Sequence, residues 1–110
     1  MNVIYKYPID ISGLQEIELP QGARILAVQV QKHYSIEKGL TQATEEPYFW
    51  ALVNTDEGRT VRRLFRIYGT GREIEERPED LDYIGSFQRG PFIYHVFERN
   101  VSKMQIRKDQ

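Results

Sequence analysis

The chain of 110 residues is long enough for one domain with a buried core and too short for two. Its 40% hydrophobic and 28% charged residues are typical of a globular protein, and a net charge of -1 gives no overall attraction to nucleic acid, membranes or acidic substrates. The absence of cysteine excludes disulfides, thiolate nucleophiles and cysteine-based metal centres.

No segment has the apolar length of a membrane span. The N-terminal stretch is interrupted by Lys6 and Asp10, and nothing further along the chain approaches the roughly 18 apolar residues that a span requires. We therefore expect no membrane association and a cytoplasmic location.

In the first half of the chain, apolar residues recur at every second position, the period of a strand with one buried face. This pattern predicts short strands at residues 3–7, 15–20 and 24–31. Residues 48–54 are densely apolar and aromatic, which indicates a strand covered on both sides. Residues 32–47 have no sustained period, so we expect a long loop there.

In the second half, residues 60–68 alternate most clearly, with Phe65 and Ile67 on the face that suits the core. Two further strands are predicted at 83–88 and 92–98. Residues 69–82 predict a second long loop, in which a proline at position 78 could begin a single helical turn.

Seven short strands without an amphipathic helix predict an all-β fold, either a small antiparallel sandwich or a partly closed barrel, with two long loops. Residues 1–98 should form the single domain, and the basic residues 99–110 a C-terminal tail or an additional edge strand. Exposed strand edges and the two apolar faces of 48–54 predict a homo-oligomer, a dimer. The predicted core comprises Ile4, Leu26, Val28, Val30, Trp50, Leu52, Phe65, Ile67, Phe87 and Val96.

The stretch YGTGREIEERPED begins as many phosphate-binding loops do, with two glycines after an apolar run. A dinucleotide-binding fingerprint needs a third glycine followed by a helix, and a P-loop needs Gly-Lys-Ser/Thr. Neither is present. We interpret Gly69 and Gly71 as a turn in which glycine supplies a positive φ or allows a close backbone approach.

Four basic residues, Arg62, Arg63, Arg66 and Arg72, are the strongest candidates for a binding surface. Arg62, Arg66 and Tyr68 should share one strand face, with Arg72 just beyond the glycine turn, so the guanidinium groups could hold a phosphate or carboxylate and the tyrosine could stack on a base. The alternative is that these arginines, together with Arg63, form a solvated face balanced by nearby glutamates. The sequence leaves both interpretations open.

No catalytic or metal-binding constellation is found. His33 and His95 are the only histidines and have no metal-ligand spacing, so we expect ordinary hydrogen-bonded side chains, no metal and no cofactor. The serines lack a nucleophile-elbow context. We therefore expect a protein that is not an enzyme.

Six ordered blocks, VIYKYPIDI, IELPQGARILAVQVQ, FWALVN, FRIYGTG, YIGSFQ and PFIYHVFE, resemble a family of short proteins of unknown function found mainly in bacteriophage and prophage genomes. The match covers most of the chain. Members of that family usually connect the VQVQ and WALV blocks by a short turn, whereas this chain has residues 32–47 there and also carries the basic tail. The resemblance implies no catalytic residue.

These observations favour a non-enzymatic, phage-type accessory protein that binds a host protein or a small nucleotide-like ligand. A structural or assembly module of a virion or replication complex is the first alternative. A single-strand nucleic-acid binder is the second, because small β domains with arginine and aromatic faces suit that role.

Overall fold

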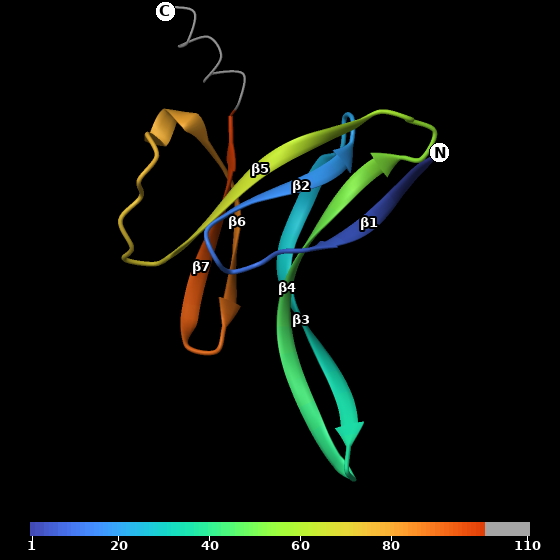
Figure 1. Cartoon of the computed structure of the whole chain (residues 1–110), viewed down its shortest axis with the longest axis vertical. Helices are drawn as coiled ribbons and strands as arrows, with labels where there is room; N and C mark the ends of the chain where they lie inside the picture. The colour runs from blue at the N-terminus through green and yellow to red at the C-terminus, as the bar shows by residue number, and fades with distance from the viewer. Residues whose placement is uncertain (101–110) are drawn as a thin grey trace, which may run out of the picture.

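The computed structural model describes residues 1–100, which form two antiparallel sheets packed face to face as a sandwich (Figure 1). One sheet has the order β1-β4-β3 and the other β2-β5-β7-β6. The strands are β1 (Asn2–Pro8), β2 (Leu14–Pro20), β3 (Arg24–Glu37), β4 (Leu40–Asn54), β5 (Thr60–Gly69), β6 (Leu81–Arg89) and β7 (Phe92–Arg99). The all-β prediction is confirmed, in its sandwich form. Of the predicted C-terminal tail, positions 101–110 lie outside the described residues.

The core lies between the sheets, where Phe49 of β4 contacts Phe65 of β5 with ring centroids 5.2 Å apart. Both rings are 1% exposed. Phe49 also stacks on Tyr7 of β1, so one aromatic side chain joins three strands. The other buried members of this cluster are Ile9, Leu19, Ala23, Ala51, Val53, Ile67, Phe87 and Val96.

The predicted core was correct for the second sheet and partly wrong for the first. Phe65, Ile67, Phe87 and Val96 are buried, and Val28 and Val30 pack against them half-buried. Two other members were wrong for different reasons: Ile4 faces outward from an edge strand and is 58% exposed, whereas Leu26 is 44% exposed as the extra residue of a β-bulge.

Trp50 and Leu52 are also misplaced in the predicted core. Both sides of β4 are apolar, and the structure buries the side of Phe49, Ala51 and Val53, leaving Trp50 and Leu52 half-buried on the outer face. Strand periodicity alone does not say which of two apolar faces is inward.

The long loop predicted at residues 32–47 is wrong, because these residues extend β3 and β4 into one continuous hairpin. Glu37 pairs with Leu40, and the two residues between them, Lys38 and Gly39, have φ values of 52° and 75°. Positive φ at both central positions is the requirement of a two-residue hairpin turn. The far half of this hairpin extends well beyond the other strands (Figure 1).

The second predicted loop is confirmed, together with its helical turn. Residues 70–77 have no strand, and a short 3-10 helix, η1 (Pro78–Asp80), begins at the proline as expected. Gly71 has a φ of 87°, and the Arg72 N–H donates to the Gly69 carbonyl across a tight turn. No helix among residues 1–100 has the length and apolar character needed to cross a membrane.

One largely buried ion pair joins β5 to β7. Arg63 lies on the inner face of β5, where its Nε and Nη2 donate to the two carboxylate oxygens of Glu98 at 2.6 and 2.7 Å. Its Nη1 donates to the carbonyl of Ala23 at 2.6 Å. The side chains of Arg63 and Glu98 are only 20% and 18% exposed, so this arginine is structural rather than part of a solvated face.

Removing Arg63 should therefore destabilise the fold. We expect Arg63→Ala to lower the free energy of unfolding by about 2 to 3 kcal/mol, because it leaves the Glu98 carboxylate unpaired in a largely dehydrated site. Arg62→Ala, one residue away on the exposed face, should change it by less than about 0.5 kcal/mol. Urea denaturation measures both, and equal effects of the two substitutions would contradict the structural role of Arg63.

Candidate functional site

The outer face of the β2-β5-β7-β6 sheet carries most of the predicted site residues. Alternation along β5 directs Phe65 and Ile67 into the core and Arg66 and Tyr68 outward, as predicted from the sequence. The connection from β5 to η1 folds back over this face and meets both outward side chains.

Arg66 is committed to contacts within the chain. Its Nη2 donates to Glu75 Oε2 at 2.9 Å, and its Nε lies 3.1 Å from both Glu76 Oε1 and the Tyr68 hydroxyl. The hydrogen bond with Tyr68 and the charges of Glu76 and Glu75 raise the pKa of Arg66. With its side chain 18% exposed, Arg66 holds the loop rather than facing a ligand.

The Tyr68 hydroxyl is the centre of the same network. It donates to Glu76 Oε2 at 2.8 Å and accepts hydrogen bonds from Arg66 Nε and from the backbone N–H of Glu75. Glu75 and Glu76, which follow the glycine turn, are thus anchored on the sheet, and both pair with Arg66.

Arg62 lies apart from the other predicted site residues. Its side chain is 77% exposed, and its closest acidic partner is Glu16, at 3.9 Å. Leu64 separates it from Arg66 on the same face, a spacing of about 13 Å along a strand, so the two guanidinium groups do not converge on one anion.

Arg72, by contrast, borders two adjoining cavities. It is exposed and, within residues 1–100, its side chain has no hydrogen-bond or ion-pair partner. The larger cavity, of about 630 Å³, lies over the start of β7 and includes Phe92, Ile93 and Tyr94. The smaller, of about 190 Å³, lies beneath the loop on the outer face. Gly69 and Thr70 border both cavities with Arg72.

Aromatic rings from three strands line the smaller cavity. Tyr68 of β5, Tyr83 of β6, and His95 and Phe97 of β7 all contribute to it. The centroids of Tyr83 and Phe97 lie 5.2 Å apart, and those of Tyr68 and Phe97 lie 6.4 Å apart. Tyr83 is 56% exposed, so its ring offers a surface to a flat ligand.

Hydrogen bonds fix the orientation of His95. The Thr70 hydroxyl donates to the Ile93 carbonyl, so it accepts from His95 Nε2 at 2.9 Å. In the neutral ring, His95 Nδ1 then accepts from the Tyr83 hydroxyl at 3.0 Å. Both ring nitrogens are engaged, as expected for an ordinary hydrogen-bonded histidine.

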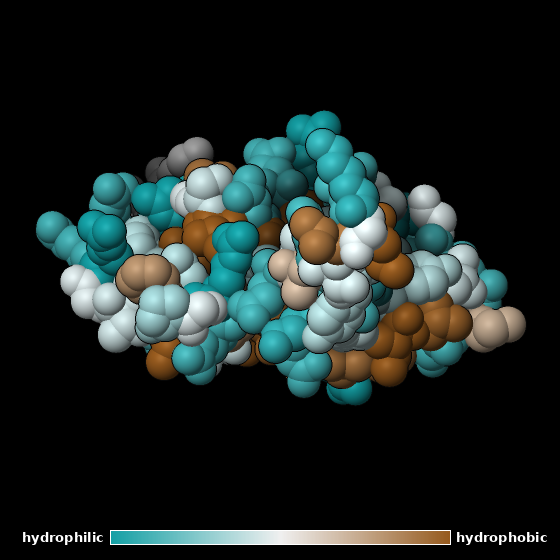
Figure 2. Space-filling model, turned by 90° about the horizontal axis from the view of Figure 1, so that it is seen from below, coloured by the Kyte–Doolittle hydropathy of each residue, from teal (hydrophilic) through white to brown (hydrophobic). Residues whose placement is uncertain are grey.

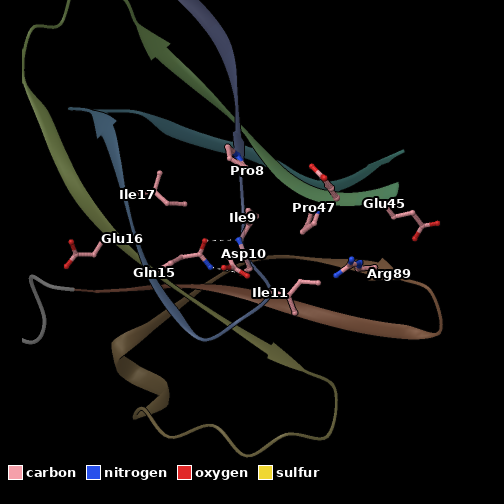
Figure 3. A pocket seen from close by; sticks show the side chains of 11 residues that line it. Pro8, Ile9, Asp10, Ile11, Gln15, Glu16, Ile17, Glu45, Pro47 and Arg89 are labelled. Atoms are coloured by element: carbon pink, nitrogen blue, oxygen red, sulfur yellow. Dashed lines mark hydrogen bonds between the residues drawn. The ribbon is translucent and has the colours of Figure 1, made fainter. Parts of the chain in front are cut away.

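A separate cleft, of about 530 Å³, lies between the sheets where the β3–β4 hairpin leaves the sandwich. Figure 3 shows Ile9, Ile11, Ile17 and Pro47 around this inter-sheet cleft, with Arg89 reaching in from the end of β6. Carboxylates are also among its lining residues: Asp10, Glu16, Glu45 and Glu46.

Hydrogen bonds hold one wall of the inter-sheet cleft in place. The Gln15 amide accepts from the Asp10 backbone N–H at 2.9 Å and donates to the Asp10 carbonyl at 2.7 Å. The N–H of Ser12 donates to the Asp10 carboxylate. The β1–β2 connection is therefore fixed by its own side chains. Within residues 1–100, no group of three His, Cys, Asp or Glu side chains could hold a metal ion.

The outer face of the β1-β4-β3 sheet is partly apolar. Ile4, Leu26, Trp50 and Leu52 lie there half-buried or exposed, and Figure 2 shows hydrophobic side chains gathered on the side of the molecule where Figure 1 places these strands. Lys6 covers part of this face, with its Nζ 4.5 Å from the centroid of the Tyr48 ring.

Sequence reasoning did not identify Tyr83, His95 and Phe97 as site residues. They come from β6 and β7, and they meet Tyr68 only because β7 lies between β5 and β6 in the sheet. Alternation in FIYHVF puts His95 and Phe97 on one face, but the sequence does not say beside which strand.

A family profile described as a domain of unknown function (DUF7352) matches residues 1–107. No curated protein and no solved structure matches this chain. The match agrees with the expected membership of a family of unknown function, and it covers nearly the whole chain.

Replacing Arg66 should loosen the loop that it anchors. We expect Arg66→Gln to lower the free energy of unfolding by about 1.5 kcal/mol, because charged hydrogen bonds to Glu75 and Glu76 are lost. Amide hydrogen exchange at residues 70–77 should accelerate, above all at Glu75. Arg72→Gln is the matched control and should leave both unchanged. Undisturbed exchange in Arg66→Gln would show that the arginine does not hold the loop.

Proposed function

We propose that this chain, which belongs to the DUF7352 family of domains of unknown function, is a non-enzymatic binding protein for a small nucleotide-like anion. The ligand occupies the two adjoining cavities that Arg72 borders. The observation that carries this proposal is the position of Arg72, a guanidinium without a partner among residues 1–100, at the junction of an aromatic-lined cavity and a larger groove.

The aromatic cavity suits a base. Rings stack on nucleobases with little sequence preference, because every base has a π-face, and each stacked base contributes about 1 to 3 kcal/mol. The exposed ring of Tyr83, with Phe97 beside it, offers such a surface. The smaller cavity takes the base, and the groove over Phe92 and Ile93 takes the rest of the molecule.

The negative group of the ligand lies at Arg72. Arg66 and Tyr68, two of the predicted ligand residues, shape this site from below by holding Glu75 and Glu76 against the sheet. The positive charge of Arg66 offsets part of the negative charge of these two carboxylates, which would otherwise repel an anion more strongly. Arg62 lies outside both cavities and takes no part in binding.

The biological setting follows from the resemblance of the six sequence blocks to phage and prophage proteins. It supports an accessory protein that acts in the cytoplasm of a phage-infected cell, where binding a nucleotide-like molecule would remove it from the host. No residue is proposed to catalyse a reaction, and His95 serves to position Tyr83 and Thr70.

A structural or assembly role in a virion or replication complex is the second candidate. The partly apolar outer face of the β1-β4-β3 sheet favours it, because exposed apolar patches often mark protein contacts. Co-purification of the protein with phage particles would support this role.

Ligand binding can be tested with a panel of nucleoside mono- and diphosphates, cyclic nucleotides, dinucleotides and a short single-stranded oligonucleotide. A ligand at 100 times its Kd should stabilise the fold by about 2.7 kcal/mol, which a thermal shift detects. We expect Arg72→Gln to weaken binding at least about tenfold by calorimetry, as loss of one charged hydrogen bond predicts.

Two matched controls locate the site. Arg62→Gln removes the same charge outside the cavities and should leave the affinity unchanged. Tyr83→Leu should weaken binding, whereas Tyr83→Phe keeps the ring and should retain most of it. If the panel gives no shift, or if Arg72→Gln binds as well as the unaltered protein, the proposed function is wrong. Binding of the oligonucleotide alone would favour a nucleic-acid binder instead.

A further inference from the structure

The projecting part of the β3–β4 hairpin, residues 32–45 (the arm), continues the core-facing side of its sheet. Directly paired residues of antiparallel strands lie on the same face, and faces alternate along each strand. Val28 pairs with Phe49 in the core, so Tyr34 with Ala43 and Ile36 with Thr41 lie on this same face further out. The core-facing side of β3 and β4 thus continues beyond the region that the β2-β5-β7-β6 sheet covers.

Within residues 1–100, the outer part of this face is left exposed. Tyr34 is 69% exposed and Ile36 is 78% exposed. A two-stranded hairpin without further packing is marginally stable in water, and exposed apolar strands invite association. The arm therefore needs a surface to pack against.

The inter-sheet cleft offers such a surface, and it lies at the base of the arm. Glu45 and Pro47 of β4 line it, beside the floor formed by Ile9, Ile11 and Ile17. Of its four lining carboxylates, Glu16 and Glu45 lie 3.9 Å from Arg62 and Lys32, and Glu46 accepts a hydrogen bond from the Tyr48 hydroxyl, which leaves Asp10 for an incoming basic group. The only arginine among the lining residues is Arg89. The side chain of Arg89 has no hydrogen-bond or ion-pair partner among residues 1–100.

The tip of the arm has the complementary chemistry. Ile36 and Leu40 are apolar, Lys38 is basic, and Glu37 is acidic. Within residues 1–100, Lys38 is the only non-glycine residue with positive φ, a conformation that costs roughly 1 to 2 kcal/mol in a residue with a Cβ. The two-residue turn requires this conformation at Lys38, which lies exposed at the tip of the arm.

We propose that the occupant is a second copy of this chain: two arms pack antiparallel about a two-fold axis, each tip seated in the inter-sheet cleft of the other protomer. From base to tip the arm spans about 20 Å at 3.3 to 3.4 Å per residue. In an antiparallel pair of that length, each tip reaches the base of the other arm, where the cleft lies. Ile36 packs toward the apolar floor, Lys38 meets Asp10 and Glu37 faces Arg89. The contact is closed and self-complementary, as two-fold interfaces are.

Sedimentation velocity from low to high micromolar protein tests this interface. The unaltered protein should be a dimer, and Ile36→Asp should weaken dimerisation at least about tenfold, or about 1.4 kcal/mol. Ile4→Asp is the matched control: it places the same charge on the outer face of the same sheet and should leave the dimer intact. A monomeric unaltered protein, or a dimer lost in Ile4→Asp and kept in Ile36→Asp, would overturn the proposal.

Because the chain has no cysteine, crosslinking tests the arrangement directly. Lys38→Cys combined with Arg89→Cys should give a covalent dimer with a bismaleimide shorter than the arm. Lys38→Cys alone should remain a single chain on a denaturing gel, because the two tips lie about 20 Å apart. Crosslinking of the single variant would mean that the tips meet each other, which contradicts seating in the cleft. Neither experiment depends on a nucleotide, so its outcome is independent of the proposed function.

Discussion

The contact between Phe49 and Phe65 determines where the other features of this molecule lie. These rings are 1% exposed, join the two sheets, and fix which side of β4 and β5 faces inward. Since strand side chains alternate, an inward Phe65 places Arg66 and Tyr68 outside, where they anchor the loop that roofs the aromatic cavity. The same alternation places Tyr34 and Ile36 on the extension of the face that Phe49 buries. The positions of the candidate ligand site and of the apolar face of the arm thus both follow from the inward packing of Phe49 and Phe65.

Much of the fold could be predicted from the sequence because most strands have one apolar face. Alternation identified six of the seven strands and the correct inward face of β5, the dense apolar run at residues 48–54 identified the seventh, and Pro78 indicated the single helical turn. The predictions failed where that signal is weak. In β4 both faces are apolar, and only packing against β5 selects Phe49 over Trp50. In β3, Lys32 interrupts the apolar series of the arm, and a Lys-Gly turn is less typical of hairpins than Asn-Gly or Asp-Gly.

The candidate site was less predictable than the fold, because it depends on strand order. Arg72 and Tyr68 were found from β5 and its turn, but Tyr83 and His95 join them through pairing across β7, after a bulge that shifts the register of β6 near Gly85. In the sequence, Arg66 looked as free to bind a ligand as Arg72. Its pairing with Glu75 and Glu76 depends on how the loop folds back, which no local pattern specifies.

The central claim is that the core-facing side of β3 and β4 continues past its own sandwich and is completed by a second copy. Amide hydrogen exchange as a function of protein concentration tests it most directly. Arm amides at residues 33–43 should be protected at high concentration and exchange faster on dilution, while amides of β5 and β7 stay unchanged. Exchange in the arm that does not depend on concentration would contradict the claim.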